Sequence, residues 1–86
     1  MSNAAVIVES RLEKALRKMN VCYNKSYENK GTSFEIIGSR YNVSVFDTGD
    51  EFLCNTTHAT NKTEAHIKIY KTIRGVTGFI CRWLEK

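Results

Sequence analysis

One cysteine and two histidines are spaced in a way that suits a metal ion or a nucleophile. Cys54 and His58 have three residues between them, and His66 follows further along the chain. A structural zinc site normally has four protein ligands, and only Cys22 or Cys81 remain to complete one. A thiol nucleophile also needs a base that a third group orients, and nothing here orients His58. We therefore expect no bound metal, no cofactor and no catalytic residue.

The acidic residues and glycines also lack a recognisable catalytic arrangement. Asp47, Asp50 and Glu51 surround Gly49, which is ordinary turn composition rather than a cation site. The Glu-Asn-Lys sequence at 28–30 resembles part of a nuclease motif, but it lies in a predicted turn and no aspartate precedes it. No glycine-rich phosphate loop precedes a predicted helix. Since none of these motifs is complete, we expect a protein that is not an enzyme.

Length and composition favour one small globular domain over residues 1–86. The 86 residues are 42% hydrophobic and 26% charged, which is typical of a folded soluble protein. No apolar run approaches the ~20 residues that cross a bilayer, and no secretory signal begins the chain, so we expect a cytoplasmic protein without membrane contact. Three widely spaced cysteines predict reduced thiols rather than disulfides.

Positive charge is concentrated at the two ends of the chain. Residues 1–20 have four basic and two acidic residues (4 − 2 = +2), and residues 21–60 have three and five (3 − 5 = −2). Residues 61–86 have six and two (6 − 2 = +4). A polyanion is therefore expected to approach the ends of the chain.

The spacing of the apolar residues predicts an α+β fold. Residues 4–20 have helical periodicity, with Ser2 or Asn3 as the cap and Asn20 as the stop. A strand-like alternation then begins. The predicted strands are 21–27, 32–37, 40–46 and 51–56. The expected order is α-β-β-β-β-α, an antiparallel meander with the N- and C-terminal helices packed on one face.

Two turns predict how the strands pair. Gly38-Ser39 fits a two-residue type II′ turn, which sets Phe34 opposite Val43 and Ile36 opposite Tyr41. A four-residue turn at 47–50 sets Val45 opposite Phe52 and Val43 opposite Cys54. All seven side chains then share one face. The other face is polar except for three residues that are either edge residues or a docking patch: Ile37, Phe46 and Leu53.

A last helix is predicted over residues 61–84, with Asn61 and Glu64 in the positions of a capping box. Its core stripe would contain Ala65, Ile69, Ile73, Val76, Ile80, Trp83 and Leu84. A basic ridge about 27 Å long would run from Lys68 to Lys86. The cations expected to contact nucleic-acid phosphates are Lys68, Lys71, Arg74 and Arg82, with Arg11, Lys14 and Lys18 added if the two helices lie side by side with their charged edges aligned.

Two glycines separate the cations of this ridge into two clusters. Gly75 and Gly78 each cost about 1 kcal/mol in a helix interior, so we consider three explanations. The helix is broken at Gly75, or it is continuous with the glycines facing solvent or the first helix, or a second copy of the chain packs on them. A third side of this helix carries Tyr70 and Cys81, either covered by the first helix or exposed as a contact surface.

The expected order of elements resembles that of the double-stranded-RNA-binding domain, which also follows a helix with an antiparallel sheet and a second helix. This chain has an extra predicted strand, and Thr60–His66 lacks the lysine cluster of that domain. The resemblance is one of topology. The sequence predicts a small nucleic-acid-binding module, with a protein-interaction or inhibitor module as the alternative, acting as a monomer or homodimer.

Overall fold

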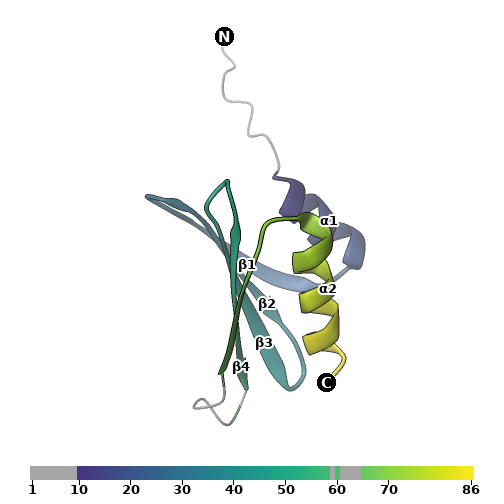
Figure 1. Cartoon of the computed structure of the whole chain (residues 1–86). Helices are drawn as coiled ribbons and strands as arrows, with labels where there is room; N and C mark the ends of the chain where they lie inside the picture. The colour runs from purple at the N-terminus through teal and green to yellow at the C-terminus, as the bar shows by residue number, and fades with distance from the viewer. Residues whose placement is uncertain (1–9, 59, 61–64) are drawn as a thin grey trace.

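A computed structural model describes residues 10–58, 60 and 65–86 (Figure 1). In chain order the elements are α1 (Arg11–Met19), β1 (Cys22–Glu28), β2 (Gly31–Ile37), β3 (Tyr41–Asp47), β4 (Phe52–His58), β5 (Ala65–Tyr70) and α2 (Ile73–Leu84). The strands form one antiparallel meander in the order β1-β2-β3-β4-β5, with β1 and β5 at its edges. The α+β class is confirmed, and the sheet has one strand more than predicted.

The first helix begins later than the apolar periodicity indicates. Ser10 has extended backbone dihedrals, and its side chain accepts a hydrogen bond of 3.1 Å from the backbone N–H of Glu13. Ser10 is therefore the N-cap, and the predicted start at residue 4 is wrong. Ser2 and Asn3 lie outside the described residues. Asn20 ends the helix in the left-handed conformation (φ 58°), which confirms the predicted stop.

The largest correction concerns the predicted helix over residues 61–84. Its first described part is the strand β5, and α2 starts only after Thr72, whose Oγ1 accepts a 3.0 Å hydrogen bond from the N–H of Gly75. Asn61 and Glu64, the predicted cap, lie outside the described residues. Since α2 continues through both Gly75 and Gly78, a break at Gly75 is also wrong. Pairing with β4 provides the hydrogen bonds of this β-branched segment and overrides its helical spacing.

The strand register differs from the prediction by two residues. Ile36 lies opposite Val43 rather than Tyr41, and Val45 lies opposite Cys54 rather than Phe52. A type II′ turn needs a positive φ at its first glycine, yet among the described glycines only Gly49 has one (96°). The connection at Gly38 is therefore longer than two residues. Because side chains alternate with period two, a shift of two leaves each one on its predicted face.

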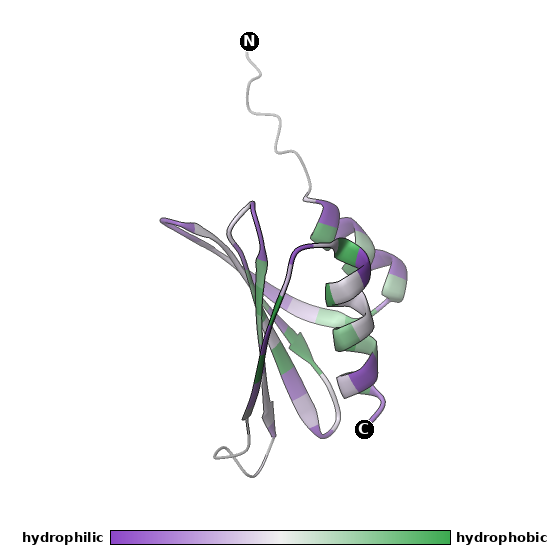
Figure 2. Ribbon diagram, viewed as in Figure 1, coloured by the Kyte–Doolittle hydropathy of each residue, from purple (hydrophilic) through white to green (hydrophobic). Residues whose placement is uncertain are grey.

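Both helices cover one face of the sheet, as predicted, and the core lies between the two layers (Figures 1 and 2). The buried apolar residues are Leu12 and Leu16 of α1, Phe34, Ile36, Val43, Val45 and Cys54 of the sheet, and Val76, Phe79 and Ile80 of α2. Ile69, predicted for the core stripe, is instead 57% exposed on β5. Phe79 was outside the predicted stripe and is buried, where its ring contacts those of Tyr70 and Trp83.

The two helices lie side by side and run in the same direction. Arg11 at the start of α1 lines one hollow together with Thr72 and Ile73 at the start of α2. Met19 at the end of α1 lines another together with Leu84 near the end of α2. Matching ends therefore meet at each end of the pair, and the outer sides of both helices form a single surface.

Candidate functional site

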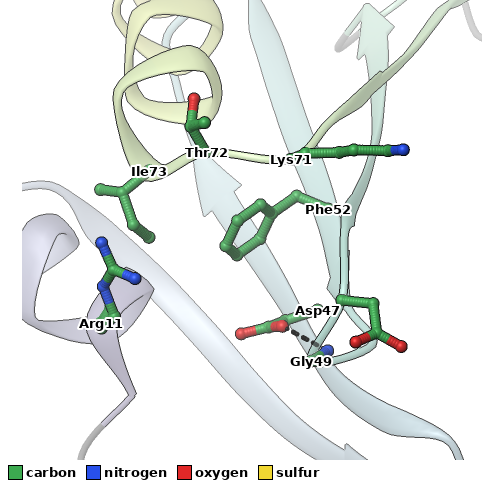
Figure 3. Close-up of a pocket in the computed structure, with 8 residues that line it drawn as sticks. Arg11, Asp47, Gly49, Phe52, Lys71, Thr72 and Ile73 are labelled. Carbon is green, nitrogen blue, oxygen red and sulfur yellow. Dashed lines mark hydrogen bonds between the residues drawn. The ribbon is translucent and has the colours of Figure 1, made fainter.

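The outer surface of the helix pair, called here the helix-layer surface, is strongly basic. Residues 10–20 and 71–86 contain eight basic and two acidic residues (8 − 2 = +6), whereas residues 21–58 contain three and five (3 − 5 = −2). All eight basic residues are exposed: Arg11, Lys14, Arg17, Lys18, Lys71, Arg74, Arg82 and Lys86. Positive charge is thus concentrated in the helix segments and the link before α2, although the Lys71 side chain on that link points away from the helices (Figure 3). The strands β1 to β4 and their turns are slightly acidic.

The predicted cations come from three kinds of element rather than from one helical ridge. Arg74 and Arg82 lie on α2, Lys71 lies on the link before it, and Lys68 lies on β5. The ridge from Lys68 to Lys86 along a single helix is therefore wrong. The structure meets the first part of the condition set for Arg11, Lys14 and Lys18, because α1 lies beside α2. The alignment of the charged edges of the two helices stays a prediction.

One of the two acidic residues of the helix layer is engaged with the sheet. The carboxylate of Glu13 lies 2.6 Å from the Nζ of Lys25 on β1, and it accepts a 2.9 Å hydrogen bond from the hydroxyl of Tyr23. The hydrogen bond from Lys25 holds the pKa of Glu13 below its ordinary value. Glu13 thus turns toward β1 and does not neutralise the lysines on the outer side of α1.

A hollow of about 260 Å³ lies where the two helices begin (Figure 3). Arg11 and Lys71 line it, but so do Asp47 and Asp50. Asp47 accepts a hydrogen bond of 2.9 Å from the backbone N–H of Gly49, which closes the turn between β3 and β4. Charges of both signs meet in this hollow, so it has no clear preference for an anionic or a cationic ligand.

An aromatic cluster that sequence reasoning missed joins four elements at one end of the sheet. The ring of Trp83 on α2 lies 4.6 Å from the ring of His66 on β5 and 4.7 Å from that of Tyr41 on β3, centroid to centroid. The ring of Tyr41 also meets that of His58 on β4, at 4.9 Å and nearly perpendicular. The single tryptophan of the chain could have indicated a possible aromatic site, but its ring partners are distant from it in the sequence.

The residues considered for zinc have other roles in the structure. Cys54 is buried in the core, and burial raises the pKa of its thiol to about 11, so the thiol stays neutral and unsuited to metal binding. His58 and His66 belong to the aromatic cluster instead. Over the part of the chain that the structure describes, histidines, cysteines and carboxylates form no group of three or more around a common point.

The outer face of the sheet, away from the helices, carries an apolar patch next to the edge strand β5. Phe46, Leu53 and Ile69 are directly opposite one another on three neighbouring strands, and Ile67 lies beside them. Ile67 is 75% exposed and Leu53 36% exposed, while Phe46 is partly covered. We call these four residues the outer patch. Ile37, predicted with them, is 43% exposed but lies near the other edge.

Of the four contact residues predicted for the last helix, Tyr70 and Gly75 are used within the chain, and Gly78 and Cys81 face solvent. Tyr70 packs on Phe79 at 5.6 Å within the same chain, and a Cβ at Gly75 would lie 2.7 Å from the Tyr70 ring. Gly75 therefore makes room for an internal contact. Gly78 has open space where a Cβ would be, and Cys81 is exposed. Only these last two remain available to another molecule.

Comparison with known protein families, with curated proteins and with solved structures found no match to this chain. Among the described residues, neither helix has the length and apolar character needed to cross a membrane. The surfaces themselves therefore carry the functional argument.

Proposed function

We propose that this chain is a small, non-enzymatic cytoplasmic module that contacts the backbone of nucleic acid through the helix-layer surface. The observation that supports the proposal is that α1 and α2, each with several exposed cations, lie side by side over one face of the sheet (Figure 1). The helix α2 alone extends about 18 Å, so the surface spans several phosphates of a nucleic-acid strand.

The charge distribution favours a polyanion over an uncharged ligand. With a net charge of +6 on the helix segments and −2 on the segments 21–58, the field of the molecule orients an approaching polyanion toward the helices. Arg74 lies in the first turn of α2 and Lys14 lies in α1, and both side chains are exposed. Contacts of this kind position a strand without reading its sequence.

Salt dependence tests the proposal most directly. Binding of labelled duplex and single strands is measured by fluorescence anisotropy between ~50 and ~200 mM salt. The logarithm of the association constant is expected to fall linearly with the logarithm of salt concentration, with a slope of nearly one per phosphate contacted. Absence of binding at the lowest salt would rule out the function.

A second candidate function, self-association or protein binding, is favoured by the exposed outer patch at a sheet edge. The N–H of His66 points toward β4, where it donates a 3.2 Å hydrogen bond to Oγ1 of Thr56. Neighbouring residues of a strand point in alternate directions, so the N–H and C=O groups of Ile67 and Ile69 point off the edge of the sheet. Such an edge with apolar side chains and no charge on its outer face is a template for another strand.

A second copy of the chain suits this edge in one register. With Ile67 opposite Ile67 of the second copy, the two outer patches meet and Lys68 faces His66 of the copy. A shift by one residue in each chain would place Lys68 opposite Lys68, which repels. An antiparallel pair of this kind has its twofold axis perpendicular to the sheet, so both helix-layer surfaces face the same side. Self-association would thus extend the basic surface.

A further inference from the structure

The aromatic cluster lies at the border of the helix-layer surface and is open to solvent on one side. His66 is exposed, and Tyr41, His58 and Trp83 are half-buried. The rings of His66 and Trp83 are in contact at 4.6 Å between centroids and are tilted by 33°, and His66 is the more exposed of the two. A flat ligand can stack over His66 without any opening of the core.

One cation contacts the cluster and two more lie close to it in the sequence or in the sheet. The Nζ of Lys86 lies 5.1 Å from the Trp83 ring centroid, and the exposed Arg82 is next to Trp83 in α2. Lys68 lies on the same face of β5 as His66, two positions along, because their partners on β4 are Cys54 and Thr56. An aromatic cluster bordered by such cations is complementary to a base that is joined to phosphates.

We propose that a base of single-stranded nucleic acid stacks on His66, whose other neighbour is the ring of Trp83, while Lys68, Arg82 and Lys86 contact its phosphates. This inference rests on the proposed function and specifies its ligand. A base in a duplex already stacks on its neighbours, so only an unpaired base can lie on a protein ring. The helix-layer surface then holds the backbone of either form, and the cluster distinguishes single strands from duplexes.

The fluorescence of Trp83 provides the test, because this residue is the sole tryptophan of the chain. Three probes are compared: a short oligothymidylate, the same length of duplex, and a linear polyphosphate that has charges but no bases. The oligothymidylate is expected to quench Trp83 emission strongly, whereas the polyphosphate binds without comparable quenching.

Two variants separate stacking from charge. His66→Ala removes the outer ring but keeps the backbone N–H that bonds to Thr56, and it should weaken single-strand binding by roughly 5- to 150-fold. Polyphosphate binding should be unchanged, and His66→Tyr should restore the single-strand affinity. Tyr27→Ala serves as a control, since it removes a ring that is 68% exposed on the opposite edge strand.

The outcomes distinguish this inference from the function on which it rests. The stacking proposal would be overturned, with backbone binding intact, by either of two results. One is equal quenching of Trp83 by all three probes, and the other is an equal loss of affinity for the single strand and for polyphosphate in His66→Ala. Failure of every polyanion to bind at low salt would overturn both.

Discussion

The carboxylate of Glu13 and the Nζ of Lys25 lie 2.6 Å apart and join α1 to the edge strand β1. Their side chains are 16% and 19% exposed, so the pair is largely shielded from solvent. The same carboxylate accepts the hydroxyl of Tyr23, and this explains why a glutamate occurs among the lysines of α1.

Acid is expected to weaken the Glu13 contribution to stability. Its folded-state pKa is lowered below the ordinary value of 4.5, mainly by the hydrogen bond from Lys25. A carboxyl group with a lowered pKa stabilises the fold above its unfolded pKa and loses this effect as the pH falls through the folded one. Glu13→Gln should therefore lower the urea midpoint at pH 7, and its difference from the parent should shrink toward pH 3. A difference that is constant with pH would mean that the charge of Glu13 has no part in stability.

The two glycines of α2 should respond in opposite ways to alanine. Nothing lies within 4 Å of a Cβ at Gly78, so Gly78→Ala should raise the free energy of unfolding by about 0.5–1 kcal/mol through helix propensity. At Gly75 a Cβ would lie 2.7 Å from the Tyr70 ring and 3.1 Å from Oγ1 of Thr72. Gly75→Ala should destabilise the protein by about 1–3 kcal/mol through overpacking, as measured by urea denaturation.

The sedimentation of a Gly78 variant also tests the interface predicted for this side of α2. Gly78→Leu should leave the oligomeric state of the parent unchanged, because self-association is expected at β5 instead. A change in the oligomeric state caused by this variant would indicate that the Gly78 side of α2 contacts a second chain.

Thiol reactivity should divide the three cysteines. Cys22 and Cys81 are exposed, while Cys54 is buried and its pKa is raised to about 11 by desolvation. At pH 8, a thiol reagent should label Cys22 and Cys81 of the folded protein, and Cys54 should react only in denaturant. Rapid labelling of Cys54 in the folded state would contradict the packing of the core.

The sequence predicted the structure correctly where the apolar residues fitted one periodicity, and incorrectly where they fitted both a strand and a helix. From residue 21 to residue 58 the alternation gave the correct faces even with a register error, because an error of two residues preserves them. In β5, Ile67 and Ile69 alternate like strand residues, but Ile69 and Ile73 also have helical spacing, and the nearby sequence resembled a cap. Pairing with β4 decides between the two, and a single sequence does not contain that information.

The candidate sites were predictable only in part, for a similar reason. Net charge and its position follow from composition, so the basic character of the last helix was evident. The parallel packing of α1 on α2 is a tertiary contact, and so is the meeting of Tyr41, His58, His66 and Trp83. Contacts between distant segments arise from the fold rather than from local spacing.

Self-association through β5 should depend on Ile67. Ile67→Lys places a charge where two outer patches would meet, so it should convert a dimer to a monomer in analytical ultracentrifugation. Asn24→Lys is the matched control, because Asn24 is exposed on the same face of the other edge strand. Because the contact between the copies would consist of apolar side chains and main-chain groups, salt should affect the dimer much less than it weakens nucleic-acid binding. A parent protein that remains monomeric at high concentration in both low and moderate salt would refute this pairing.

Reversal of one charge at the start of α2 should separate binding from folding. Arg74 is exposed in the first turn of α2, where the helix dipole disfavours a cation. Arg74→Glu should therefore stabilise the fold slightly, by about 0.3–1 kcal/mol, and yet weaken nucleic-acid binding and reduce its salt slope by about one unit or more. Lys30→Glu changes the net charge equally in the turn between β1 and β2, on the sheet side, and should leave the slope nearly unchanged. If the two variants lose affinity equally, net charge alone drives binding and the helix-layer surface has no special role. If only Arg74→Glu loses it, with its stability intact, the loss is due to the position of the charge on the helix layer.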